Sequence, residues 1–211
     1  MQCKLMSSSS KIPRVVRKHD AKQSFTESTY RKKAFPKLMD DFEKRCAYSM
    51  VHVSVTSETN MEVDHFNSTL AGKKRHTYSN LYPASSVCNG AKRDVWPTKN
   101  DLKKRRRFLD CCIETDYGVH FFEDKATGEL LPVTAEGVYH IENCDLNNDW
   151  LKQRRLERTE NKKILAALND AAASPIGPTK QNSQDLISVM EERIKIGIPK
   201  IPALPPGSVP L

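Results

Sequence analysis

The hydrophobic and polar positions in the first half of the chain predict a helix, two strands and a second, shorter helix. Apolar residues recur at helical spacing between residues 30 and 45, and Pro36 would have to begin this helix or lie in its first turn. Valine alternates with polar residues from Val51 to Val55, which predicts a strand. The pattern at residues 61 to 65 predicts a second strand, and residues 85 to 93 fit a short helix.

The second half of the chain is more helical. Residues 117 to 133 contain two apolar runs separated by a turn, which predicts a hairpin. Between residues 145 and 172 the apolar side chains lie mostly on one stripe, which is the strongest helix signal in the sequence. Proline and glycine between residues 174 and 184 predict a linker, and one more helix is expected at residues 185 to 195.

Together these elements predict an α+β fold, in which a small strand–strand–helix core is embedded in a mainly helical protein. Four segments are expected along the chain. They are a flexible basic arm (1–30), the core with a helix before and after it (31–110), a hairpin and long helix packed on the core (111–172), and a linker, short helix and proline-rich extended tail (173–211).

Composition narrows the classes of partner. Hydrophobic residues make up 38% of the 211 residues, so the core is modest, and the formal net charge of +8 favours a polyanionic partner such as nucleic acid. A solvated basic surface would give the same charge. No secretory signal is expected, and no segment is long enough to cross a bilayer. We therefore expect a cytoplasmic protein without a membrane partner, in which the six cysteines are free thiols.

The residues that carry chemistry lie in three short blocks. Asp64-His65 ends the second predicted strand, Asn80 follows 15 residues later, and Asn89 lies in the short helix. A histidine can take a proton from water near neutral pH, and carboxylate and amide oxygens are hard ligands suited to Mg²⁺. Adjacent residues of a strand point to opposite faces, so Asp64 and His65 can share a site only where the strand ends or bulges. Taken alone, a histidine such as His65 is more often a buried core residue than a catalytic one, and Asn80 could be a turn residue.

At these positions the chain resembles the HNH, or ββα-metal, endonuclease superfamily. The similarity covers residues 46 to 97 and consists of Asp64-His65, Asn80-Leu81 and the Cys-Asn-x-x-Lys run from Cys88 to Lys92. It implies a metal-dependent endonuclease that hydrolyses phosphodiester bonds of DNA, with RNA as an alternative substrate. One such site cuts one strand, so a nicking activity is expected, with Mg²⁺ or Mn²⁺ as cofactor.

The resemblance also implies a role for each residue. Asp64 and Asn89 would bind the metal, His65 would be the general base, and Asn80 would hold the loop and orient His65. The basic residues expected to contact the substrate are Lys92 and Arg93 on the helix and Lys73, Lys74 and Arg75 in the loop.

A structural zinc is expected to be absent. Many such nucleases hold zinc with two Cys-x-x-Cys pairs, but here Cys46 is followed by Ser49, and Cys88 is preceded by Ser85. A serine hydroxyl is a poor substitute for a thiolate in a tetrahedral zinc site.

Residues 138 to 155 resemble the region after the core in small standalone nucleases of bacterial defence systems, Septu among them. This implies a role in anti-phage defence. Two alternatives to an independent nuclease remain open, one from the N-terminal arm and proline-rich tail and one from the loss of half the zinc ligands. The chain could be active only with an ATPase partner, bound through the N-terminal arm or the proline-rich tail. It could also be a non-catalytic nucleic-acid-binding module on a decayed HNH scaffold.

Overall fold

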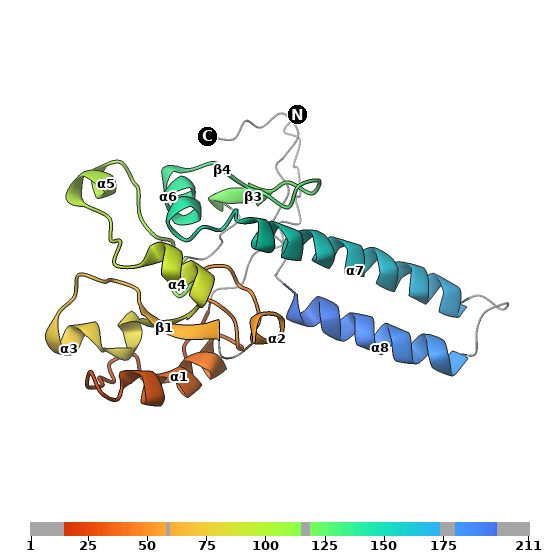
Figure 1. Ribbon diagram of the computed structural model, residues 1–211, viewed down its shortest axis with the longest axis horizontal. Helices are drawn as coiled ribbons and strands as arrows, with labels where there is room; N and C mark the ends of the chain where they lie inside the picture. The colour runs from red at the N-terminus through yellow and green to blue at the C-terminus, as the bar shows by residue number, and fades with distance from the viewer. Residues whose placement is uncertain (1–14, 58–59, 115–118, 174–179, 198–211) are drawn as a thin grey trace, which may run out of the picture.

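The computed structural model describes residues 15–57, 60–114, 119–173 and 180–197 (Figure 1). Within them the protein has an α+β fold, with two separate two-stranded antiparallel sheets among the helices. This confirms the expected α+β class, whereas the HNH core remains a prediction. None of the helices in these ranges combines the length and apolar character that crossing a membrane requires.

The centre of the fold is a strand–strand–helix unit. Strand β1 (Met61–His65) pairs with β2 (Leu81–Ser85) in an antiparallel register, from Met61 opposite Ser85 to His65 opposite Leu81. Helix α4 (Ser86–Lys92) follows β2 directly, and the Ser85 hydroxyl caps it by accepting the amide of Cys88 at 3.3 Å. The short helix expected near residues 85 to 93 is therefore confirmed.

Helix α1 (Tyr30–Asp41) packs on the other face of this sheet, so the two strands lie between α1 and α4 (Figure 1). The expected helix is present but ends earlier than Arg45. Pro36 is in its interior, not in the first turn. Proline removes one amide donor there. Ala34 and Leu38, two residues before and after Pro36, have no exposed surface. This part of the helix is therefore packed against the core.

The strand expected at Val51 to Val55 is wrong. The segment forms one turn of helix, α2 (Val53–Thr56), and the ring of His52 caps it by accepting the amide of Ser54 at 3.2 Å. The strand with Asp64-His65 is therefore the first of the core, and its partner follows the loop after it.

The N-terminal segment packs on the core where the structure describes it. The guanidinium of Arg17 lies over the rings of Phe42, Tyr78 and Tyr82, and it donates to the carbonyls of Tyr78 and Leu81. The expectation of a flexible arm is therefore wrong for residues 15–29, because these contacts hold them. Its first 14 residues lie outside the described part.

Of the next elements, the helix after the core unit and the hairpin were expected, whereas the helical turn between β1 and β2 was not. Helix α3 (Gly72–Arg75) lies in the loop between β1 and β2, and α5 (Lys99–Lys103) follows α4. The predicted hairpin is confirmed as β3 (Phe121–Glu123) paired with β4 (Leu130–Pro132).

Three helices end the described chain. Helix α6 (Ala135–Asn143) precedes the long helix α7 (Asp149–Ala173), which begins four residues later than expected. Helix α8 (Lys180–Ile196) is longer than predicted and packs along α7, so the two extend together from the rest of the fold (Figure 1). The proline-rich tail lies outside the described residues.

Candidate functional site

His65 is the last residue of β1, and its ring faces α1. The ring centroid is 4.9 Å from that of Tyr30, and Nε2 lies 3.1 Å from Nδ1 of His76. Burial, with Arg75 and His76 nearby, lowers the pKa of His65 to about 4. The ring is therefore neutral at physiological pH, as a group that accepts a proton from water must be.

Asp64 points to the opposite face of the sheet and is 5% exposed. The hydroxyl of Tyr48 donates a short hydrogen bond to its carboxylate. Burial and the Asp64 carboxylate raise the pKa of Tyr48, so this hydroxyl stays protonated. The ammonium of Lys92 lies 3.0 and 3.2 Å from the two oxygens of Asp64. Both carboxylate oxygens are thus already engaged within the protein.

The placement of Lys92 corrects its expected role. Its side chain has no exposed surface, and its Nζ also donates to the carbonyl of His65 at 3.1 Å. Because the ammonium group is enclosed between β1 and α4, it cannot contact a phosphate in this arrangement. Lys92 compensates the buried charge of Asp64 instead.

Asn89 lies one turn before Lys92 on α4, and its amide donates a short hydrogen bond to Glu62. Two pairs therefore cross from β1 to α4, Glu62 with Asn89 and Asp64 with Lys92. A metal shared by Asp64 and Asn89 would have to displace the ammonium of Lys92. The donor set as arranged does not fit Mg²⁺ at these two residues.

The strand itself is regular at this point. Asp64 pairs with Tyr82 and His65 with Leu81, in the same register as the rest of β1. The strand ends at His65 without a bulge, so the two side chains keep opposite directions. Asp64 and His65 are therefore neighbours in the chain but face different helices.

Asn80 closes the loop that connects the two strands. Its Oδ1 accepts the amide of Asn67 at 2.9 Å, and its Nδ2 donates to the carbonyls of Asn67 at 3.3 Å and Arg75 at 3.0 Å. These are backbone contacts at both ends of the loop, as the expected loop-holding role requires. They hold the chain on which His76 lies.

A cavity of about 500 Å³ opens beside β1, between α1 and α4. Of the expected site residues, Asn89 lines it. The side chains around it combine basic, acidic and apolar groups: Arg31, Lys32, Phe35, Pro36, Met61, Glu62, Val63 and Asn89.

The basic residues divide into exposed and engaged groups. Lys73 and Lys74 on α3 are exposed, as is Arg93 after α4, while Arg75 donates to the carbonyl of Ser68 at 3.0 Å. In the basic run at residues 103–107, all three arginines pair with acidic side chains of the chain itself. Lys73, Lys74 and Arg93 are thus the expected substrate contacts that remain open to solvent.

The positions expected to have lost zinc lie together. Cys46 and Cys88 are buried, their thiols hydrogen-bond each other, and the Cys46 sulfur accepts the amide of Ser49 at 3.5 Å. Burial raises the pKa of Cys46, but the hydrogen bonds with Cys88 and Ser49 outweigh it and lower the pKa to about 6. The backbone of Ser85 contacts the same sulfur. The absence of zinc remains a prediction.

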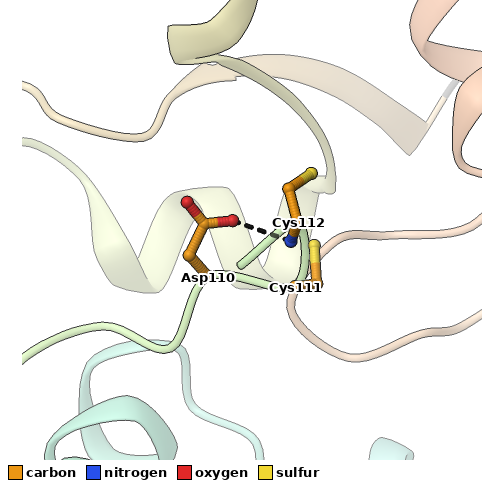
Figure 2. Close-up of side chains that lie close together, drawn as sticks. All are labelled: Asp110, Cys111 and Cys112. Carbon is orange, nitrogen blue, oxygen red and sulfur yellow. Dashed lines mark hydrogen bonds between the residues drawn. The ribbon is translucent and has the colours of Figure 1, made fainter. Parts of the chain in front are cut away.

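Two other groups in the described residues have ligand atoms close enough for a metal. One is Asp110, Cys111 and Cys112, and Figure 2 shows the Asp110 carboxylate accepting the amide of Cys112, at 2.8 Å. The Asp110 oxygen that accepts the amide of Cys112 also accepts the hydroxyl of Tyr82 at 2.8 Å. The second group is His19 with two acidic residues of α1. Neither group includes Asp64 or Asn89.

No model of a known protein family matches the chain, and a search of curated proteins also finds no match.

Sequence reasoning missed the partners of the expected residues. Tyr48 contacts Asp64, Glu62 contacts Asn89, and His76 contacts His65. His76 has a weak signal in the sequence, since it lies directly after the basic loop and shortly before Asn80. Glu27, which contacts His76, has none, because it is 38 residues before His65, in the turn that precedes α1.

Proposed function

We propose that this protein is an HNH-type endonuclease that hydrolyses phosphodiester bonds of DNA, with His65 as the general base. The observation that carries the proposal is the order and geometry of one unit. Asp64-His65 ends β1, and the side chain of Asn80 hydrogen-bonds the backbone of the loop that follows β1. Strand β2 then leads directly into α4, which contains Asn89. RNA is the alternative substrate, because basic side chains bind both backbones.

Hydrolysis of a phosphodiester requires a proton transfer from water and displacement of one ester oxygen at phosphorus. The neutral ring of His65 takes a proton from water, and the oxygen of the resulting hydroxide forms a bond to phosphorus. The bond from phosphorus to one ester oxygen breaks, and its electron pair stays on that oxygen, which then takes a proton from solvent. Lys73, Lys74 and Arg93 are placed on the exposed surface where they can hold the backbone of the substrate.

Mg²⁺ or Mn²⁺ remains the proposed cofactor, and it would supply charge stabilisation on the phosphate. Its ligands are not assigned to Asp64 and Asn89, because Asp64 is engaged with Lys92 and Tyr48. A defence role and an ATPase partner belong to the same proposal and rest on the resemblance alone, whereas a cytoplasmic location is proposed from the sequence pattern.

The test is a plasmid assay with wild type and His65→Ala in Mg²⁺, in Mn²⁺ and in chelator. We expect nicked plasmid from wild type with either metal, and a loss of about 10²–10⁴-fold in His65→Ala, the usual contribution of a general base. His52→Gln is the matched control, since the ring of His52 caps α2 and contacts only Ser54 of that helix among the hydrogen bonds of the described residues. Equal cleavage by His65→Ala would refute the assignment.

One observation favours a second candidate, a non-catalytic nucleic-acid-binding module. The Asp64 carboxylate is sealed by Lys92, as it would be in a scaffold that no longer binds metal. That candidate predicts that wild type binds DNA but leaves plasmid intact with either metal. It also predicts that Asp64→Asn changes stability and leaves DNA affinity unchanged.

A further inference from the structure

A row of three polar side chains leads from the surface to His65. Oε2 of Glu27, which lies in the turn before α1, is 2.6 Å from Nε2 of His76. The other ring nitrogen of His76, Nδ1, is 3.1 Å from Nε2 of His65. The ring of Tyr30 lies against both histidines, with centroid distances of 4.8 Å to His76 and 4.9 Å to His65. Glu27, His76 and His65 therefore form a continuous path.

The backbone holds the outer part of this path in place. The amide of Phe25 donates to the carbonyl of His76 at 3.1 Å, and Ser24 forms an antiparallel bridge with Thr77. The side chain of His76 is 9% exposed, whereas that of Glu27 is 79% exposed. The histidine is thus fixed inside the fold, and its carboxylate partner can be changed without disturbing the core.

The contacts determine which nitrogen of each neutral ring carries the proton. A carboxylate only accepts, so Nε2 of His76 must be protonated to donate to Glu27. A neutral His76 then has its lone pair on Nδ1, and Nε2 of His65 must donate to it. A neutral His65 with its proton on Nε2 has its own lone pair on Nδ1.

We propose that Glu27 and His76 are positioning residues that hold His65 in the tautomer whose Nδ1 carries the lone pair. Within the described residues no hydrogen bond reaches this Nδ1, so it is left for a water molecule or the substrate. The use of that lone pair rests on the nuclease function proposed above, whereas the tautomer does not. When Nδ1 takes a proton from water, Nε2 stays bonded to His76, and the Glu27 carboxylate offsets the charge that forms.

The tautomer can be measured without any activity. In the full-length protein labelled with ¹⁵N-histidine, two-bond proton–nitrogen spectra at neutral pH identify the protonated nitrogen of each ring. His65→Gln and His76→Gln assign the two signals. We expect protonated Nε2 on both rings in wild type, and a mixture of tautomers at His65 in Glu27→Gln. Asp40→Asn is the matched control, because Asp40 is also an exposed carboxylate of this region but pairs with Lys18.

The spectra overturn the proposal if His65 of wild type carries its proton on Nδ1. They also overturn it if His65 keeps a single tautomer in both Glu27→Gln and His76→Gln. Should His76→Gln fail to fold, Glu27→Gln decides alone, because its side chain is at the surface.

The plasmid assay then separates this inference from the proposed function. We expect Glu27→Gln to lower the cleavage rate constant by about 10-fold without raising KM, the usual size for a residue that orients another. Glu27→Asp, which keeps the carboxylate, should recover most of the rate. If His65→Ala cuts like wild type, the nuclease function fails and the tautomer result stands. If His65 is essential but Glu27→Gln and His76→Gln cut like wild type, the positioning role is overturned.

Discussion

At the scale of single residues, the buried charge of Lys92 stabilises the fold by pairing with a buried carboxylate. Its ammonium group lies against both oxygens of Asp64 and the carbonyl of His65, and it has no exposed surface. Removing one partner of such a pair leaves the other charge buried and uncompensated. Lys92 therefore joins β1 to α4 at the point where the candidate site begins.

We predict that Lys92→Met lowers the free energy of unfolding by about 3–5 kcal/mol, as expected when one partner of a buried pair is lost. Urea unfolding at neutral pH measures this. Lys74→Ala is the control, because Lys74 is exposed on α3. It should leave stability unchanged, weaken DNA binding and reduce the salt dependence of that binding. If Lys92→Met is as stable as wild type but binds DNA more weakly, Lys92 contacts the substrate and does not stabilise the fold.

The spacing of the three blocks predicted the order of these residues along the core unit, but not that Asp64 and His65 face different helices. Asn80 ties the loop as expected, because an amide has donors and an acceptor for both strands of a turn. The contacts of Asp64 could not be predicted in the same way. Tyr48 and Lys92 reach it from two different elements, and only the packing of the whole core brings them there.

At the scale of elements, Pro83 explains why the second strand of the core was not predicted. Proline lacks an amide donor and usually argues against a paired strand. Here the Pro83 carbonyl accepts the amide of Ala47 at 2.7 Å, so its backbone polar groups point away from β1. The missing donor therefore costs the sheet no hydrogen bond. The alternating valines from Val51 to Val55 predicted a strand that does not form, because His52 caps a helical turn there.

The two turns with Cys46 and Cys88 allow a test at the same scale. Each turn keeps one thiol, and Ser49 and Ser85 lie at the other two positions beside the Cys46 sulfur. We predict that Ser49→Cys and Ser85→Cys together create a four-thiolate site that binds one zinc per chain. Zinc binding should also raise the unfolding midpoint, because the unfolded chain lacks the assembled site.

Elemental analysis of purified protein and thermal unfolding with and without zinc measure both effects. Ser54→Cys with Ser86→Cys is the matched control, since these serines lie at the starts of α2 and α4. A double variant at 49 and 85 that stays free of zinc would mean that the four thiols, although close together, cannot adopt a tetrahedral arrangement around one ion. Stoichiometric zinc in wild type would show that serine does not prevent binding.

At the scale of the whole molecule, residues distant in sequence meet around the core unit. The amide of Val15 donates to the carbonyl of Cys111 at 2.9 Å, and the ring of His140 on α6 lies near those of Tyr48, Phe108 and Phe121. His140 has no exposed surface. It therefore connects the segments before and after the core unit, although nothing in the sequence distinguishes it from a surface histidine.

This position makes the fold sensitive to acid. Burial, with His120 and Arg107 nearby, lowers the pKa of His140 to about 3, and its Nδ1 accepts the amide of Leu109 at 3.2 Å. In the unfolded chain the pKa returns to about 6.5, so below that pH the unfolded state binds a proton that the folded state does not. The stability contributed by neutral His140 is present above about pH 6.5 and is lost as the pH falls towards 3.

We predict that His140→Gln reduces the loss of unfolding free energy between about pH 7 and pH 5 by about 2 kcal/mol, following the linkage slope per pH unit. Urea unfolding of wild type and variant at both values gives the difference, and other histidines cancel because they are common to both proteins. The window lies above the usual range of carboxyl groups, so Asp41, whose pKa is lowered, does not contribute. Parallel losses in the two proteins would mean that His140 is protonated inside the fold, and the junction around it would then have to admit water.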